Sequence, residues 1–298
     1  MSRCVLGFAY FISVVYYLEL LAAFILHILG LKNQVEANLI TSGILIGIAA
    51  VGLWRGLALL EGVERYAVGL NLGMISSLIV ALAIYNVMLA SGGEWALPDL
   101  DSSVSGKDLR VLLGLLIVVQ GFETSRYLGA KHPAEERIKT MRSAQLIASG
   151  IYLLFVSLAK VLFQPGMGGD VTAILTMTAP VAIVLPFLLS IAAVGSQFSA
   201  AVADTAGAGG LVGDLTNQKV GEKGAYLLIL GVTLALTWVV DVNEIIALAS
   251  RAFALFYTLQ CVVAALVGFG KQHHRRAGGF LVLGLLCFMV FLLGIPSE

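Results

Sequence analysis

Charged residues are scarce in this sequence. Only 12% of its 298 residues are Asp, Glu, Lys or Arg, whereas a soluble globular domain carries about 25%. The 18 basic residues equal the 18 acidic ones, so no basic surface is left over for a nucleic-acid backbone. We therefore expect neither an ordinary soluble fold nor a nucleic-acid partner.

Cysteine and proline are also scarce. Cys4, Cys261 and Cys287 stand in apolar runs without CxxC spacing, which argues against a disulfide framework and a zinc site. Motifs such as HExxH and GxSxG are absent, so we expect neither an enzyme nor a cofactor. The six prolines stand against 33 glycines, a balance that suits close helix packing in lipid.

Hydrophobic residues, in contrast, make up 59% of the chain and gather in long runs. A helix needs about 20 mostly apolar residues to cross a bilayer, and nine stretches qualify. The sequence predicts an all-α polytopic membrane protein with about nine transmembrane helices, forming a single transmembrane domain over 1–298 in the lipid bilayer. The predicted spans are 5–30, 38–60, 66–91, 109–128, 140–164, 178–203, 224–241, 243–269 and 278–295.

The distribution of Lys and Arg predicts the orientation of these spans. Cytoplasmic loops carry an excess of basic residues, and thirteen of the 18 fall on the side of the N-terminus. We expect a cytoplasmic N-terminus, a main cytoplasmic loop at 129–140, and a C-terminus at Ser297 and Glu298 on the outside. The least certain boundary between spans is the short connection from Asp241 to Asn243.

Ionisable groups at membrane depth face protein or water, which makes each one a functional candidate. Glu19 lies near the middle of the first span, where it serves a substrate or proton path or is a neutral structural acid. Glu123 lies in the fourth span, within Gln120–Arg126. The glycine, hydroxyls and carboxylate of that stretch predict a discontinuous helix that lines a cavity, and the alternative is a plain helix end with a Glu123–Arg126 pair.

The sixth and eighth spans hold further polar candidates. Ser196 and Ser199 share a helical face, where they either coordinate a hard cation or bond back to helix carbonyls. Beyond the predicted span end, Asp204 is followed by Gly207–Gly210, which we expect to terminate the helix. Arg251 either faces the central cavity, pairs with a carboxylate or extends to the interface.

The order of several segments resembles the amino acid-polyamine-organocation (APC) superfamily, whose members share the LeuT-like inverted-repeat fold. Gly121–Gly129, with His132–Pro133 and Thr140–Arg142 after it, is similar to the sixth and seventh helices of that fold. Tyr16–Tyr17 resembles the third helix, Leu60–Arg65 the turn between the fourth and fifth, and Ala193–Ser199 the ion-site stretch of the eighth.

The resemblance implies a domain organisation. The nine spans would be helices three to eleven of the LeuT-like fold, with a partial first repeat of three helices at 1–91. The second repeat of five helices would be 109–269, and 278–295 would be an extra C-terminal helix. In that fold the third helix starts in the cytoplasm, which agrees with the distribution of basic residues.

The resemblance also implies a function. The implied protein is a secondary active transporter for an amino acid or related small amine-bearing solute. It would work by alternating access, with ion coupling or exchange, in the plasma (inner) membrane. The implied substrate-binding residues are Tyr16, Tyr17, Gln120, Gly121, Phe122 and Glu123. The implied ion- or proton-coupling residues are Glu19, Glu123, Ala193, Ser196, Gln197 and Ser199.

The ion site departs from the family pattern at one position. A sodium ion would bind at Ala193 and Ser196, but Gln197 stands where the family has a hydroxyl. Sodium coupling, proton coupling and uncoupled exchange therefore remain alternatives.

The first two helices of the fold have no counterpart before residue 5. The alternative function is therefore a truncated or non-transporting membrane protein that needs a partner to complete the site. The sequence leaves the oligomeric state open.

Overall fold

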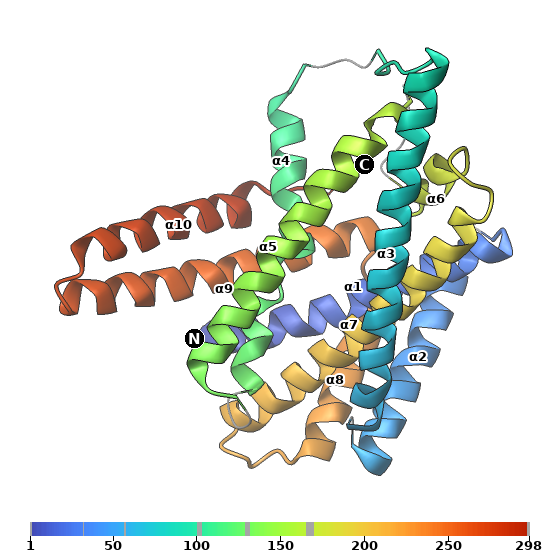
Figure 1. The fold of residues 1–298 in the computed structure, drawn as a ribbon. Coiled ribbons are helices and arrows are strands. Elements are labelled where there is room, and N and C mark those ends of the chain that lie inside the picture. Colours follow the sequence, from blue (N-terminus) through green and yellow to red (C-terminus); the bar gives the residue numbers. More distant parts are fainter. Residues whose placement is uncertain are drawn as a thin grey trace.

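The computed structural model describes residues 2–31, 33–56, 58–99, 103–128, 132–164 and 170–296. The side chains of 55, 58–65, 126–128, 242 and 243 lie outside this description. The described residues form helices and no strand (Figure 1), which confirms the predicted all-α class.

Seven described helices are long and apolar enough to cross a membrane. The structure contains α1 (Ser2–Leu29), α2 (Gln34–Arg55), α3 (Ala58–Gly92), α4 (Gly106–Gly114), η1 (Leu116–Val119), η2 (Phe122–Leu128), α5 (Ala134–Ala159), η3 (Lys160–Leu162), α6 (Ala173–Thr178), α7 (Leu185–Leu215), α8 (Glu222–Thr237), α9 (Val242–Gly270) and α10 (His274–Leu293). The seven are α1, α2, α3, α5, α7, α9 and α10. The other two predicted spans correspond to the 16-residue α8 and to the broken run from α4 to η2.

Helix α1 is the centre of the molecule. Its hydrophobic residues surround the whole helix, and such a helix is stable only when neighbours cover every side. It packs against α7, α9, α2 and α8. Of the residues in its most apolar 18-residue stretch, 67% are buried. Tyr10, Ile12 and Leu18 of α1 meet Phe253 of α9 in this core.

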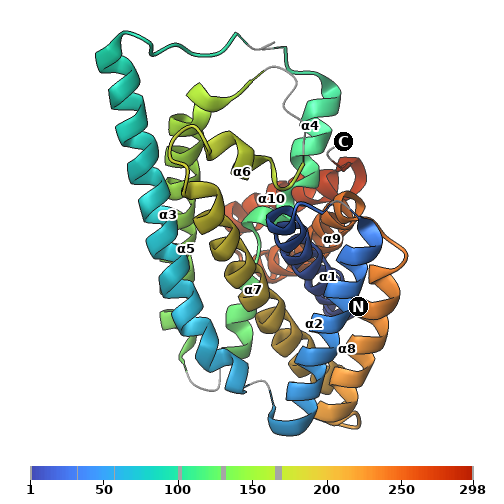
Figure 2. The ribbon, with the colours of Figure 1, turned by 90° about the vertical axis from the view of Figure 1, so that its right-hand side faces the viewer.

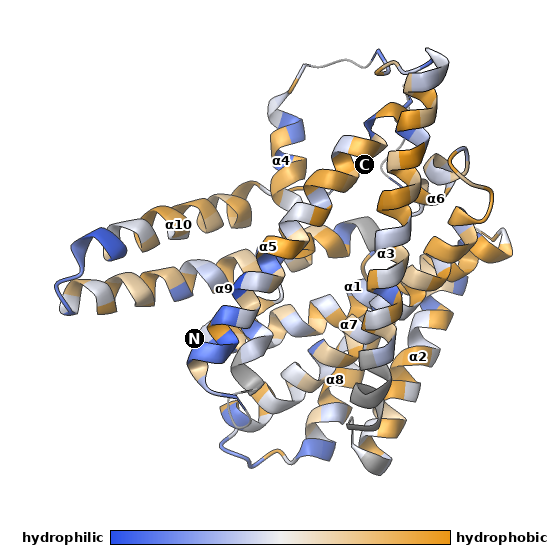
Figure 3. Ribbon diagram, viewed as in Figure 1, coloured by the Kyte–Doolittle hydropathy of each residue, from blue (hydrophilic) through white to orange (hydrophobic). Residues whose placement is uncertain are grey.

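Helices α3 and α5 lie at the periphery. Figure 2 shows α3 at one side, α2 and α8 at the opposite side, and α7 between them. A second, smaller cluster joins α3, α5, α6 and α7 through Leu78, Leu82 and Leu185. Their outward faces are apolar, with Val80 and Leu153 exposed, and Figure 3 shows hydrophilic residues gathered at the first turns of α5 and α10. Apolar residues facing outward are what a lipid-facing surface requires.

The expected turn at Leu60–Arg65 is wrong. Helix α3 already begins at Ala58, and the preceding helix ends at Arg55. Gly56 has a φ of +73°, a conformation that glycine adopts without steric penalty. The side chains of Glu61, Glu64 and Arg65 lie outside the described residues.

The predicted bounds of the sixth span, 178–203, are also wrong. Helix α7 runs from Leu185 to Leu215 and continues through Gly207–Gly210. Pro186 fits its first turn. The glycines allow close packing, because a Cβ on Gly207 would lie 3.4 Å from the Tyr10 ring and one on Gly209 would lie 3.2 Å from the Tyr226 ring. Gly207–Gly210 is therefore a packing surface and not a helix terminator.

Two other connections are clarified. Helix α5 begins at Ala134 after Pro133, so the expected loop at 129–140 is shorter than predicted. Helices α8 and α9 are separate, and Asp241 precedes the first turn of α9, as the sequence predicted. The predicted C-terminal residues Ser297 and Glu298 lie outside the described residues.

Candidate functional site

The fourth predicted span is a discontinuous helix. Helix α4 starts with a capping box, in which Ser105 and Asp108 bond reciprocally to each other's backbone N–H, and it ends at Gly114. The tighter helices η1 and η2 follow, and Gln120 and Gly121 between them are not helical. Gly121 has a φ of +115°, which L-residues rarely adopt. The predicted break in this span is confirmed.

Neighbouring side chains satisfy backbone groups that the break frees. The N–H of Ile117 donates to Ser250 Oγ at 3.0 Å, and the Tyr152 hydroxyl donates to the C=O of Val118 at 3.0 Å. Unpaired backbone groups are costly away from water. Ser250 of α9 and Tyr152 of α5 therefore stabilise the unwound segment, defined here as residues 115–123.

Glu123 and Tyr257 meet at the end of this segment. The Tyr257 hydroxyl donates to Glu123 Oε2 at 2.7 Å, while the Tyr257 ring stacks on Phe122 with centroids 5.0 Å apart. Glu123 Oε1 is buried and has no hydrogen-bond partner among the described residues. One carboxylate oxygen is thus held by the protein, and the other is available for a further donor.

Gln120 connects the segment to α1. Its amide Nε2 donates to the Tyr17 hydroxyl at 3.4 Å, and its Oε1 is a second buried acceptor without a described partner. Tyr16 is buried beside Tyr17, with ring centroids 4.9 Å apart. The structure thus places Tyr17, Gln120, Gly121, Phe122 and Glu123 in one connected region, with Tyr16 packed beside Tyr17.

Glu19 is separated from this region. It follows Tyr17 by two residues, which turns it about 200° around the helix. It is 2% exposed, and neither carboxylate oxygen has a described hydrogen-bond partner. The electrostatic neighbour of Glu19 is Asp241 at the start of α9. Glu19 is therefore a buried acid on another face of α1.

The predicted ion-site residues all lie in α7. Ser199 is buried, whereas Ala193, Ser196 and Gln197 are half-buried. Gln197 Oε1 is a buried acceptor with no described partner. The described part of the chain contains no group of three or more His, Cys, Asp or Glu side chains that could hold a metal ion. The local chemistry of α7 is thus that of carbonyl, amide and hydroxyl oxygens, the donor types that hard cations accept.

Arg251 forms no ion pair with a carboxylate of the described residues and contacts the end of α10 instead. Its Nε donates to the C=O of Phe291 at 2.9 Å, and its guanidinium lies over the Phe291 ring. Arg110 makes a similar bond to the C=O of Leu293 at 3.1 Å. Both arginines cap the carboxyl end of α10, where positive charge is favourable. The alternative Glu123–Arg126 pair falls on a side chain outside the described residues.

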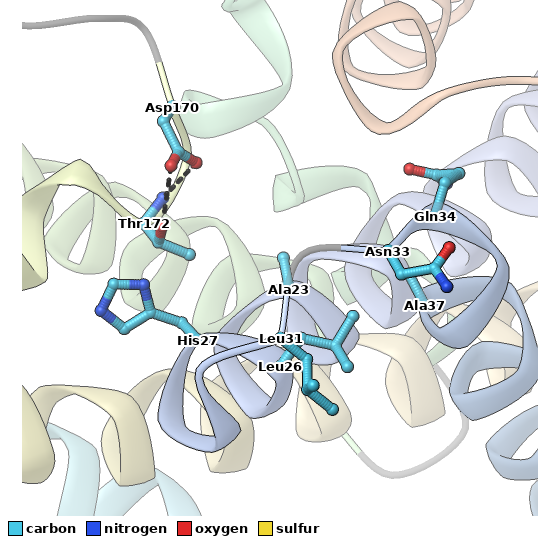
Figure 4. A pocket seen from close by; sticks show the side chains of 9 residues that line it. All are labelled: Ala23, Leu26, His27, Leu31, Asn33, Gln34, Ala37, Asp170 and Thr172. Carbon is cyan, nitrogen blue, oxygen red and sulfur yellow. Dashed lines mark hydrogen bonds between the residues drawn. The ribbon is translucent and has the colours of Figure 1, made fainter.

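A polar pocket of about 290 Å³ opens at the far end of α1. Figure 4 shows the His27 ring below Thr172, with Asp170 above. Asp170 accepts from the backbone N–H of Thr172 at 3.1 Å and from its hydroxyl at 3.0 Å. None of the predicted substrate- or ion-binding residues lines this pocket. It is therefore distinct from the unwound segment.

Sequence reasoning missed four residues of the region around the unwound segment: Ser250, Tyr152, Tyr257 and Asp204. Asp204 is 5% exposed in α7, hydrogen-bonded to Ser13 of α1, and close enough to Glu123 to interact electrostatically. A carboxyl group within an apolar run could have identified Asp204 as a candidate. The predicted span ended at residue 203, however, so Asp204 was placed beyond the end of that span. The hydroxyl residues gave no such signal, because their partners are distant in sequence.

Two sequence comparisons relate this chain to known proteins. Residues 1–294 match a family model with the description "APC superfamily transporter". An uncharacterized protein of Aquifex aeolicus (strain VF5) is 43% identical over 300 residues, an alignment that covers 100% of this chain and 72% of that relative. The similarity extends over every element that forms the region around the unwound segment.

Proposed function

Because the chain belongs to the APC superfamily of transporters, we propose that it is a secondary active transporter that binds its solute at the unwound segment. The proposed solute is an amino acid or a related small molecule with an amino group. Alternating access to the site would carry it across the membrane.

The observation that carries this proposal is the pairing of an interrupted backbone with a half-satisfied carboxyl group. Gly121 keeps the chain out of a helix, so the segment presents backbone groups that a regular helix would hide. Glu123 keeps Oε1 without a partner among the described residues, while Tyr257 fixes Oε2. An ammonium group supplies the positive charge and the donors that this oxygen lacks.

The aromatic residues provide the apolar part of the proposed site. Phe122 is 43% exposed and is held by its stack on Tyr257, so its free face can contact a solute. Tyr17, oriented by Gln120, stands on the α1 side. Tyr16 packs beside Tyr17. This arrangement of apolar walls with few polar anchors is typical of small-molecule sites.

The proposal also concerns the ion whose movement is coupled to solute transport. Glu123 is the proposed proton carrier at the site, and Glu19 is a second buried acid that could take part. A sodium ion is the alternative, bound at Ala193 and Ser196 with help from Gln197 and Ser199. The proposed location is the plasma (inner) membrane with the N-terminus in the cytoplasm.

Uptake of a mixture of radiolabelled L-amino acids into proteoliposomes tests the function. We expect saturable uptake, lost in Gly121→Leu because leucine cannot adopt the Gly121 conformation without strain, and strongly reduced in Glu123→Gln. Gly150→Leu and Glu94→Gln are matched controls, because Gly150 has open space around it and Glu94 is exposed. Wild-type uptake in both site variants would refute the site assignment.

The driving ion is tested in the same vesicles. A pH gradient without sodium should drive uptake if Glu123 carries the proton, and any uptake left in Glu123→Gln should then not respond to the gradient. Uptake driven by sodium at equal pH, and lost in Ser196→Ala, would instead favour the sodium site.

A further inference from the structure

A third buried acid, besides Glu123 and Glu19, lies where α1 crosses α7. Asp204 of α7 is 5% exposed, and Ser13 of α1 is fully buried. The two side chains are hydrogen-bonded to each other across the interface of these helices. Asp204 stands well inside the apolar 31-residue helix α7, so water cannot readily solvate its charge.

The contacts of Ser13 bear on the protonation state of Asp204. Ser13 Oγ contacts the backbone C=O of Tyr10 at 3.0 Å and also contacts Asp204 Oδ2. A hydroxyl has a single proton, and a carbonyl oxygen can only accept. If Asp204 were ionised, these two acceptor oxygens would have to share the single Ser13 proton, and the buried charge would receive only part of a hydrogen bond.

A proton on Asp204 satisfies both contacts at once. The acid then donates from Oδ2 to Ser13 Oγ, and Ser13 donates to the C=O of Tyr10. The bond to Tyr10 is the ordinary one for a serine within a helix. Each of these two contacts then has its own hydrogen, whereas the ionised form would leave a buried charge that shares one proton with a carbonyl oxygen.

We propose that Asp204 is a proton-binding site of this protein, occupied in the observed conformation and formed jointly with Ser13. The site is distinct from Glu123, because the two carboxyl groups belong to different elements and have different hydrogen-bond partners. A role for this proton in coupling rests on the proposed function, but its binding does not.

The charged and titratable groups around Asp204 agree with this assignment. Glu123 acts on Asp204 from η2, and Tyr17 faces it from α1. Tyr10, also on α1, packs against Gly207 one turn further along α7. Among the described residues no basic side chain forms an ion pair with Asp204. The neighbouring groups therefore offer hydroxyls and negative charge, and neither stabilises an ionised Asp204 as a basic partner would.

Infrared spectroscopy of the purified protein in lipid bilayers tests the proposal directly. A protonated carboxyl group has a carbonyl stretching band that a carboxylate lacks. We expect such a band at neutral pH and its loss in Asp204→Asn, which can donate its amide to Ser13 in place of the acid. Glu123→Gln and Glu19→Gln identify the bands of the other two buried acids. An unchanged carboxylic-acid region in Asp204→Asn would overturn the proposal.

A second variant keeps the acid and covers the case in which Asp204→Asn fails to fold. Ser13→Ala removes the acceptor of the acid O–H, so the carbonyl band should move to higher frequency as the carboxyl group loses this hydrogen bond. An unmoved band would contradict the proposed Asp204–Ser13 bond. Neither spectrum depends on transport, so a protein that takes up no solute but shows both results would refute the proposed function alone.

Discussion

The unwound segment and helix α7 each hold a carboxyl group in the apolar interior. In the unwound segment the backbone gives up regular hydrogen bonds, and Ser250 and Tyr152 replace some of them from neighbouring helices. Helix α7 keeps its own backbone bonds over Leu185–Leu215 and presents glycines to its neighbours. Glu123 retains an acceptor without a partner, whereas Asp204 is enclosed with Ser13.

The difference shows how one functional group, the carboxyl group, takes two roles. A polar group beside an irregular backbone can remain open to a ligand, because the site already needs side chains that reach in from other helices. Asp204, on a continuous and closely packed helix, instead finds its partner within the protein, in Ser13 of α1. The following predictions test this contrast, in order of decreasing expected effect.

Close packing should matter most on α7. Gly207→Leu places a side chain against the Tyr10 ring, and overpacking of this kind costs about 1–3 kcal/mol. The expected result is a marked loss of thermal stability in detergent. Gly195→Leu, in the same helix with open space around it, is the control. Equal losses in the two variants would contradict the packing role of Gly207.

The unwound segment should depend on the hydrogen bond between the Ile117 N–H and Ser250 for its stability. Ser250→Ala leaves the buried N–H of Ile117 without its acceptor, a change that costs about 1–2 kcal/mol. Amide hydrogen exchange at Ile117 should then be roughly 5- to 30-fold faster. Ser77→Ala is the control, because the exposed Ser77 bonds only within its own helix. Unchanged exchange at Ile117 would show that the segment does not depend on Ser250.

The Tyr257 hydroxyl should contribute to the stability of the fold through its hydrogen bond to Glu123. Tyr257→Phe keeps the stack on Phe122 but removes the donor to Glu123, a loss of about 1 kcal/mol. Unfolding measured for both single variants and for the double variant with Glu123→Gln should give a non-zero coupling energy. Tyr66→Phe, at a residue that is 82% exposed, should have no effect. Strict additivity of the two changes would contradict the Tyr257–Glu123 bond.

The smallest effect is expected at the start of α4. Hydrogen bonds from Ser105 lower the pKa of Asp108, which precedes the predicted span. Because the folded pKa lies below the unfolded one, the stabilisation is present above the unfolded pKa and is lost as pH falls through the folded value. Asp108→Asn should remove this acid-side dependence of helicity in α4. An identical pH profile in wild type and variant would contradict it.

The sequence predicted the membrane class and the interrupted helix at Gly121, and seven of its nine spans correspond to helices long and apolar enough to cross a membrane, because long apolar runs and a polar interruption are local signals. It also identified Glu123 from its depth. It did not predict the extent of α7. Gly207–Gly210 was expected to end the helix, but Gly207 and Gly209 are contact points for Tyr10 and Tyr226. Such contacts depend on helices distant in the chain, as do the partners of Ile117, Val118 and Glu123. For the same reason the sequence could not show that Glu19 faces away from the unwound segment.

The most direct test of the central claim is solute protection of a cysteine at Phe122. With Cys4, Cys261 and Cys287 replaced by alanine, Phe122→Cys should react with a water-soluble thiol reagent, since Phe122 is partly exposed. Val104→Cys, exposed ahead of α4, is the control. If the unwound segment binds the solute, the amino acid with the highest uptake will slow labelling at 122 but not at 104. Equal labelling rates at 122 with and without that amino acid would contradict the claim.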